Sequence, residues 1–171
     1  MKFLLLLLLA CTHVQASEDF IEDMCEKYKA KDCEAVKAVA WVESNFRHVV
    51  NEFDGGSPSY GPMQIKCIAA KTVGLKFGCE QLRNNRKVAM RFGIKFLELK
   101  MKKYKKMEEA FAAYNADRVI RCRTYRPSKC YPNEFVNHKY VYKVNRRYKY
   151  ERYKKFKDVK NEKILVVDNN K

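Results

Sequence analysis

The chain has few of the residues that usually bind metal ions. It contains three histidines, and none of its seven cysteines forms a Cys-x-x-Cys pair. Structural zinc sites are built from histidines and closely spaced cysteines. The three histidines are His13, His48 and His138. The sequence therefore argues against a zinc domain, and we expect neither a metal nor a cofactor.

Long hydrophobic runs are also lacking. The run Leu4–Leu9 is far shorter than the roughly 20 residues that span a bilayer. It follows the basic Lys2 and precedes the small residue Ala16, which is the pattern of a secretory signal peptide covering residues 1–16. A lipoprotein signal processed at Cys11 is the alternative. We therefore predict an exported protein, either periplasmic or secreted.

Acidic residues are outnumbered, with 20 Asp and Glu against 36 Lys and Arg, for a net charge of +16. Residues 139–171 hold nine lysines and three arginines against four acidic residues. Such a surface can bind nucleic acid, anionic lipid or another polyanion. Export argues against nucleic acid and favours an anionic surface of the cell envelope, contacted through a basic tail over residues 151–171. A solvated lysine-rich surface with no specific partner is the alternative.

Both processing routes leave six cysteines, an even number. In a small exported chain this predicts disulfide bonds. The cysteines fall into three couples that are local in sequence, and we expect them to pair in that way, although six cysteines allow fifteen connectivities. The expected pairs are Cys25–Cys33, Cys67–Cys79 and Cys122–Cys130.

The spacing of apolar residues predicts a mostly helical chain with room for a minor strand element. Between the second and third helices, residues 49–60 contain Asp54, Gly55, Gly56 and Pro58 and should form a loop or small hairpin. The predicted helices cover residues 18–30, 34–46, 62–73, 85–104, 107–116 and 135–150. We expect one domain over residues 17–150, followed by the basic tail.

Glu43 occupies an unusual place in the second predicted helix. Val36, Val39 and Ala40 mark its apolar face, and the next position of that face is Glu43. Burial raises the pKa of a carboxyl group, and the negative end of the helix dipole raises it further in the last turn. A carboxylic acid that stays protonated near neutral pH suits general-acid cleavage of a glycosidic bond. The alternative is a solvated side chain on a poorly phased helix.

Four short motifs follow one another in a fixed order. In this order and spacing they closely resemble the soluble lytic transglycosylase (SLT) family, and the resemblance covers about residues 20–150. The motifs are Glu43-Ser44-Asn45-Phe46, Gly61-Pro62-Met63-Gln64-Ile65, Ala112-Ala113-Tyr114-Asn115-Ala116 and Tyr140-Val141-Tyr142-Lys143-Val144.

The resemblance implies an α+β lysozyme-like fold, predominantly α-helical, with a minor β-hairpin or loop after the catalytic helix. It implies a monomer that acts on peptidoglycan glycan strands, with Glu43 as the catalytic acid. It also implies that the Tyr114 hydroxyl binds that carboxyl group or the substrate. The substrate-binding residues would be Ser44, Met63, Gln64, Tyr114, Asn115 and Tyr140.

The residues alone leave simpler roles open. Met63 and Tyr140 could be core residues, and Ser44 could be a polar residue near a helix end. Met63 and Gln64 should lie in the first turn of a helix that begins at Pro62, where free N–H groups can meet a substrate.

The chain departs from the family pattern at three positions. Asp117 stands where the family usually has Gly, Pro62 stands where it has Leu, and Val136 stands where many members have Glu. The departure at Val136 puts sugar contacts at the far side of the groove in doubt.

A single acid group implies a specific reaction. Glu43 would protonate the glycosidic oxygen and then act as base on the C6 hydroxyl of the substrate, which gives a 1,6-anhydro-muramic product. The first alternative is a hydrolase of the goose-type lysozyme kind, with Glu52, Asp54 or Asp117 as the second carboxylate. The second alternative is a cationic, non-enzymatic protein that binds the envelope.

Overall fold

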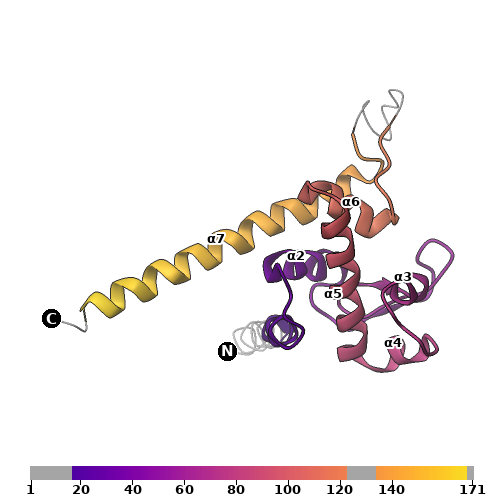
Figure 1. Cartoon of the computed structure of the whole chain (residues 1–171), viewed down its shortest axis with the longest axis horizontal. Coiled ribbons are helices and arrows are strands. Elements are labelled where there is room, and N and C mark those ends of the chain that lie inside the picture. The colour runs from indigo at the N-terminus through magenta and orange to yellow at the C-terminus, as the bar shows by residue number, and fades with distance from the viewer. Residues whose placement is uncertain (1–16, 123–133, 169–171) are drawn as a thin grey trace, which may run out of the picture.

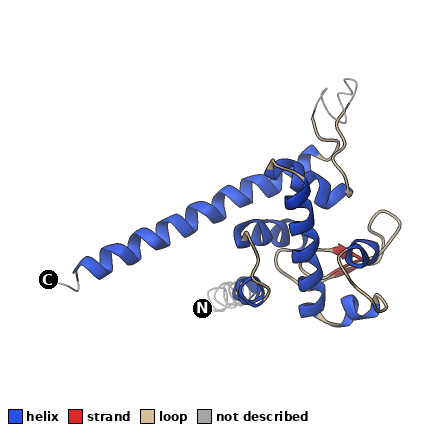
Figure 2. Ribbon diagram, viewed as in Figure 1, coloured by secondary structure: helices blue, strands red, loops and turns tan. Residues whose placement is uncertain are grey.

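A computed structural model describes residues 17–122 and 134–168, with side chains described as far as Val159. The described part is mostly helical, with one small sheet (Figures 1 and 2). Residues 17–27 are helical. The other helices are α2 (Cys33–Ser44), α3 (Cys67–Thr72), α4 (Glu80–Asn84), α5 (Arg86–Lys103), α6 (Met107–Ala116) and α7 (His138–Asp168), and the strands are β1 (Val50–Asn51), β2 (Ser59–Tyr60) and β3 (Ile65–Lys66).

The sheet directly follows α2 in the chain, as expected for a lysozyme-like α+β domain. Its strands lie in the order β1-β2-β3, and both pairs are antiparallel. Tyr60 lies opposite Val50 on one side and Ile65 on the other. The three strands are short and lie beside α3 (Figure 2).

The predicted start of the third helix at Pro62 was wrong. Residues 61–64 form a tight turn between β2 and β3, and the helix begins only at Cys67. Gly61 and Gln64 have φ values of 76° and 47°, in the left-handed region that a right-handed helix excludes. The predicted end was right, since Gly74 directly follows the C-cap residue Val73 and has a φ of 98°.

The last helix differs from the prediction at both ends. It begins at His138, and Phe135 instead forms an isolated bridge with Arg121. It continues to Asp168, well beyond the predicted end at Tyr150. Residues 134–168 contain no glycine or proline, the two residues that most disfavour a helix. The helix therefore continues past Tyr150, although the predicted apolar face ends there. Figure 1 shows that α7 begins in the body of the molecule and projects away from it.

The core lies where α2 packs against α7 and where α5 packs against α6. Val36, Val39 and Ala40 of α2 are fully buried, which confirms the predicted apolar face of this helix. The Asp32 side chain accepts a hydrogen bond of 2.9 Å from the Ala35 N–H and so caps α2.

A buried lysine of α2 joins this helix to the first helical segment and to α7. Lys37 of α2 forms ion pairs with Glu18 (2.9 Å) and Glu22 (2.5 Å) of the first helical segment. It also forms an ion pair of 3.4 Å with Glu151 of α7. Lys37, Glu18 and Glu151 are all buried. The first residue of the predicted basic tail therefore packs into the body.

Two predicted disulfides are present. Cys25 is bonded to Cys33, and Cys67 is bonded to Cys79. Cys122 is also disulfide-bonded, but its expected partner, Cys130, lies outside the described residues, as do Cys11 and the rest of the predicted signal peptide. Among the helices of the described part, none has the length and apolar character needed to cross a membrane.

Candidate active site

Glu43 lies in the last turn of α2, because the helix ends at Ser44. Asn45 takes a left-handed conformation with a φ of 53°. Its N–H donates to the Trp41 carbonyl, and the Phe46 N–H donates to the Ala40 carbonyl. This end structure stops the helix one residue after Glu43 and leaves its side chain at the edge of a cavity.

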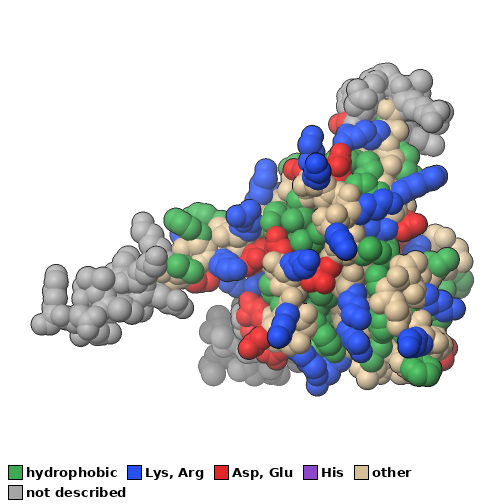
Figure 3. All heavy atoms as spheres, in the orientation of Figure 1, with side chains coloured by type: hydrophobic (Ala, Val, Ile, Leu, Met, Phe, Trp, Pro, Cys, Tyr) green, Lys and Arg blue, Asp and Glu red, His purple; other side chains and the backbone are tan. Residues whose placement is uncertain are grey.

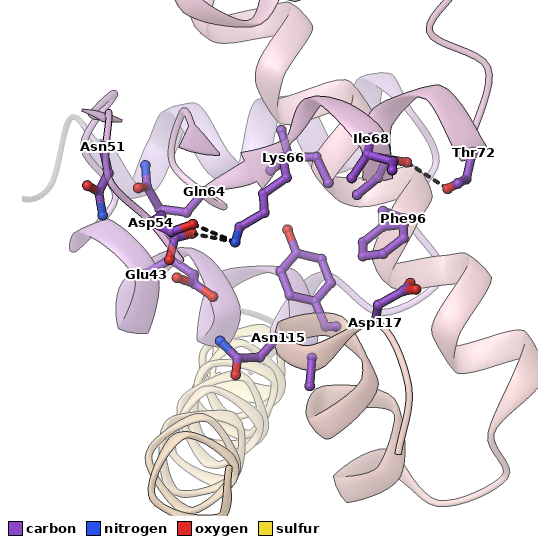
Figure 4. Close-up of a pocket in the computed structure, with 14 residues that line it drawn as sticks. Glu43, Asn51, Asp54, Gln64, Lys66, Ile68, Thr72, Phe96, Asn115 and Asp117 are labelled. Atoms are coloured by element: carbon purple, nitrogen blue, oxygen red, sulfur yellow. Dashed lines mark hydrogen bonds and ion pairs between the residues drawn. The ribbon is translucent and has the colours of Figure 1, made fainter. Parts of the chain in front are cut away.

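The cavity has a volume of about 420 Å³. Residues from α2, α3, α5, α6 and the sheet region surround it, so distant parts of the chain meet here (Figure 4). It is lined by Glu43, Asn51, Asp54, Gln64, Ile65, Lys66, Ile68, Ala69, Thr72, Phe96, Tyr114, Asn115, Ala116 and Asp117.

The surroundings of Glu43 raise its pKa to about 7. Burial is the main cause, because it disfavours the charged carboxylate. The Tyr140 hydroxyl stabilises the carboxylate and so lowers the pKa, while the negative charge of Asp54 raises it and the positive charge of Lys66 lowers it. Near pH 7, a substantial fraction of Glu43 therefore carries the proton that a general acid must donate.

Asp54 and Lys66 form a charged pair beside Glu43. The Lys66 ammonium donates a hydrogen bond of 2.7 Å to the Asp54 carbonyl and lies 3.5 Å from the Asp54 carboxylate. Figure 4 shows this pair and Glu43 facing the same cavity. Asp54 is therefore a second carboxylate that faces the cavity, and its negative charge raises the pKa of Glu43.

The other two candidate carboxylates are engaged elsewhere. Glu52 makes a two-pronged contact with Arg83, with distances of 2.6 and 2.9 Å, and it does not line the cavity. Asp117 lines the cavity, but its carboxylate pairs with Lys100 at 2.6 Å. Asp54 is thus the better placed of the three for a role next to Glu43.

Two tyrosine hydroxyls lie close to Glu43. Burial raises the pKa of both Tyr114 and Tyr140 well above the usual range, and the nearby charge of Glu43 raises both further. The Tyr140 hydroxyl faces Glu43 closely enough to lower its pKa, although the pair does not reach the geometry of a well-formed hydrogen bond. The site therefore keeps both phenols protonated and able to donate hydrogen bonds.

Tyr114 departs from one expectation. Its hydroxyl donates a hydrogen bond of 2.8 Å to the Met63 carbonyl, not to the Glu43 carboxyl. Its ring packs against Phe96, with the ring centroids 5.4 Å apart. Tyr114 therefore connects α6 to the turn between β2 and β3 while one side of it lines the cavity.

Two of the predicted site residues hold this turn in place. The Ser44 hydroxyl is buried and donates to the Pro62 carbonyl at 2.9 Å. The Gln64 amide N–H groups donate to the carbonyls of Val49 (2.9 Å) and Gly61 (2.8 Å), and its oxygen accepts from Ser59 at 2.8 Å. The side chain of Gln64 thus links the residue before β1, the strand β2 and the turn, and Ser44 ties the turn to α2.

The remaining predicted residues divide between the wall and the interior of the site. Asn115 lines the cavity, and its side-chain oxygen accepts a hydrogen bond of 3.0 Å from Asn137. Met63 is completely buried, and it does not line the cavity. Met63 and Gln64 are also not in a helical first turn, because no helix begins at Pro62.

The sequence prediction missed Asn51, Lys66 and Phe96 as residues of the cavity wall. Phe96 is a buried residue of α5, and only the fold shows that it borders the cavity. Lys66 directly follows the Gly-Pro-Met-Gln-Ile motif, and this position next to a motif was the sequence feature that could have identified it as a site residue. Within the described residues, no group of three or more His, Cys, Asp or Glu side chains is arranged to hold a metal ion.

Comparison with known proteins gives one match. The model of the family described as Transglycosylase SLT domain matches residues 21–127, more than half of the 171 residues. The matched part includes Glu43, Gln64 and Tyr114 and ends before α7, so Tyr140 lies outside it. No curated protein and no solved structure matches the chain significantly.

Proposed function

The chain belongs to the transglycosylase SLT domain family, and we propose that it is a lytic transglycosylase of peptidoglycan. Members of this family cleave glycosidic bonds of the cell wall. The bond in question would be the β-1,4 bond between N-acetylmuramic acid and N-acetylglucosamine. The observation that carries the proposal is the environment of Glu43, which opens on a cavity and has its pKa raised to about 7.

The first step would use Glu43 as a general acid. Its carboxyl proton passes to the glycosidic oxygen as the bond from that oxygen to C1 of the muramic sugar breaks, which leaves an oxocarbenium-like centre at C1. Glu43 is then a carboxylate. The nearby Lys66 charge stabilises this form, and the Tyr140 hydroxyl does the same.

The second step would use the same carboxylate as a base. It takes the proton from the C6 hydroxyl of the muramic sugar, and that oxygen bonds to C1. The product is a 1,6-anhydro sugar, formed without the addition of water. Glu43 is again protonated, so one side chain serves both steps.

The other cavity residues would bind the strand and hold the catalytic end of α2. Gln64, Tyr114 and Asn115 line the cavity, and Asn115 presents its side chain there (Figure 4). Ser44 would position Glu43, because its hydrogen bond fixes the end of α2 against the turn at Pro62. Tyr140 would contact the carboxyl group directly.

A hydrolase acting on the same substrate is the second candidate. Asp54 favours it, because this carboxylate faces the cavity and changes the pKa of Glu43. In that mechanism a second carboxylate activates a water molecule. The Asp54 carboxylate is already engaged in an ion pair with Lys66, which favours the transglycosylase route.

The proposed substrate places the protein outside the cytoplasm. We propose that residues 1–16 direct export and that the mature protein acts as a monomer in the periplasm or the secreted fraction. No cofactor enters the proposed reaction.

The test of the catalytic role replaces Glu43 by Gln. This change keeps the shape of the side chain and removes the acid, so we expect the rate of peptidoglycan solubilisation to fall by about a thousandfold or more. Glu52→Gln is the matched control, since it removes the same charge at a residue paired with Arg83 outside the cavity. The proposal would be overturned if the Glu43→Gln protein folds normally and is as active as the Glu52→Gln control.

A further inference from the structure

A second cavity lies between α2 and α7, on the side of α2 away from Glu43. Its volume is about 600 Å³. The only tryptophan of the chain, Trp41, forms part of its wall and is 40% exposed. Tyr142 and Tyr150 of α7 complete an aromatic lining and are 67% and 52% exposed. Large aromatic rings that remain exposed around a hollow are typical of a binding site.

The two cavities are separate. None of their lining residues is shared. Trp41 and Glu43 are two residues apart in α2, which places their side chains on nearly opposite sides of the helix, about 160° apart. A ligand in the second cavity would therefore leave Glu43 free for another segment of substrate.

The second cavity is also strongly cationic. Lys143, Arg146 and Arg147 line it, and no acidic residue among those the structure describes does so. Arg147 pairs with Glu151, and its guanidinium lies over the rings of Trp41 and Tyr150, 5.0 and 4.8 Å from their centroids.

The other two cations are free to meet a ligand. Lys143 and Arg146 are exposed and form no ion pair with the described residues. Arg147 thus orders the aromatic wall, while Lys143 and Arg146 provide two uncompensated positive charges.

The aromatic surface continues along α7. Tyr153 follows Tyr142 by eleven residues, which is three helical turns, and so lies on the same face. Tyr153 and Phe156 are 58% and 68% exposed. Figure 3 shows hydrophobic and basic side chains next to one another along the described part of α7 outside the body. The surface is therefore elongated, which suits a linear polymer better than a small molecule.

We propose that this surface is a second binding site for peptidoglycan, separate from the site of cleavage. A sugar ring would lie against Trp41, because the C–H faces of a pyranose are apolar and stack on aromatic rings. The carboxylates of a peptide stem would meet Lys143 and Arg146. The identity of the ligand rests on the proposed function. The site would hold the enzyme on insoluble wall while another segment enters the catalytic cavity.

Binding is tested with the full mature chain carrying Glu43→Gln, so that the wall is not digested. The measurement is co-sedimentation with purified peptidoglycan sacculi that have been freed of attached polymers. We expect Trp41→Ala, and separately Lys143→Glu with Arg146→Glu, to weaken binding by about tenfold or more. Raising the salt concentration should weaken the parent protein's binding and have less effect on the charge-reversed variant.

Each change has a matched control. Phe77→Ala removes another exposed aromatic ring, and Lys102→Glu with Lys103→Glu reverses two exposed charges on α5. Both controls should bind within about twofold of the parent, since the changes lie outside the second cavity. Circular dichroism of every variant confirms that it is folded.

Measurements of cleavage distinguish a failure of the second binding site from a failure of the proposed function. With Glu43 restored, the second-cavity variants should cleave short soluble glycan strands within about twofold of the wild-type rate and cleave sacculi more slowly. A wild-type protein that cleaves neither substrate would refute the proposed function, while Trp41-dependent binding to sacculi would still support the second site.

Two results would overturn the second site. The first is binding to sacculi that is the same in the second-cavity variants and in the controls. The second is binding of the protein, through Trp41, to vesicles of anionic phospholipid but not to sacculi, which would identify a membrane-binding surface instead.

Discussion

Glu43 is held in an environment that opposes its charge, and this has a cost that changes with pH. The pKa is about 7 in the folded protein against an ordinary value of 4.5. Between these two values the folded protein binds more protons than the unfolded chain, so stability falls as the pH rises from about 4.5 to about 7. Above pH 7 the full penalty is present.

Glu43→Gln should remove this penalty. We expect the variant to gain stability over the wild type by an amount on the order of 3 kcal/mol at pH 8 and close to nothing at pH 4. Urea unfolding of both proteins at the two pH values measures the difference. A gain that does not change with pH would show that Glu43 is not held in its neutral form.

The neighbours of Glu43 should shift the pH dependence of activity in opposite directions. Activity should decline as Glu43 loses its proton, so the alkaline limb of kcat/KM against pH reports its pKa. Asp54→Asn removes a negative charge and should move this limb to lower pH. Lys66→Met removes a positive charge and should move it to higher pH.

The same pair of variants separates electrostatic tuning from a direct role. If Asp54 is the base of a hydrolase, Asp54→Asn should abolish activity at every pH instead of shifting the limb. Limbs that stay in place in both variants would mean that another group controls the reaction.

At the residue scale, the apolar pattern of α2 marked Glu43 as an anomaly and the Glu-Ser motif made it a candidate, and the structure places it at a cavity with a raised pKa. It did not predict the hydrogen-bond partner of Tyr114 or the pairing of Lys66 with Asp54. These contacts join residues from different elements. The first depends on how α6 meets the turn between β2 and β3, and the second depends on how the loop between β1 and β2 meets β3. Periodicity within one segment contains no such information.

At the scale of the elements, helix ends with clear capping residues were predicted well. Asn85 caps α5 through the N–H groups of Lys87 and Val88. The helix α6 has no side-chain cap, and its predicted bounds, Met107–Ala116, came from its apolar periodicity alone. The turn at Gly61 was misread, because Gly-Pro before an apolar residue is also a common helix start. The pairing of β2 with β3 decided the outcome, and that pairing is made between segments.

Gly61 is the position where this turn should tolerate least change. Its φ of 76° is unfavourable for other residues, and an added Cβ would lie 2.5 Å from the Ala89 Cβ. We expect Gly61→Ala to lower the free energy of unfolding by about 2 kcal/mol and to reduce activity, since Ser44 and Tyr114 bind the carbonyls of the next two residues, Pro62 and Met63. Gly78→Ala, where nothing lies within 4 Å, is the control for chemical denaturation. Equal stability of the two variants would contradict this account of the turn.

For the whole molecule, the fold class and the family follow from four short motifs, but the course of α7 does not. The ion pair of Glu151 with Lys37 attaches the start of the predicted tail to α2, and the ion pair of Lys154 with Glu18 attaches it to the first helical segment. The residues of each pair are more than 100 positions apart, and the sequence predicted a separate basic tail from residue 151 onward. Long-range packing of charged residues was thus the part of the architecture that periodicity could not reveal.

The central claim is that one carboxylic acid, Glu43, cleaves the glycan without adding water. The most direct test is mass spectrometry of the soluble fragments that the mature protein releases from purified peptidoglycan. We predict fragments lighter by one water molecule than the corresponding reducing muropeptides, as expected when the C6 hydroxyl closes on C1. Fragments with ordinary reducing ends would contradict the claim and identify a hydrolase, with Asp54 as the residue to examine next.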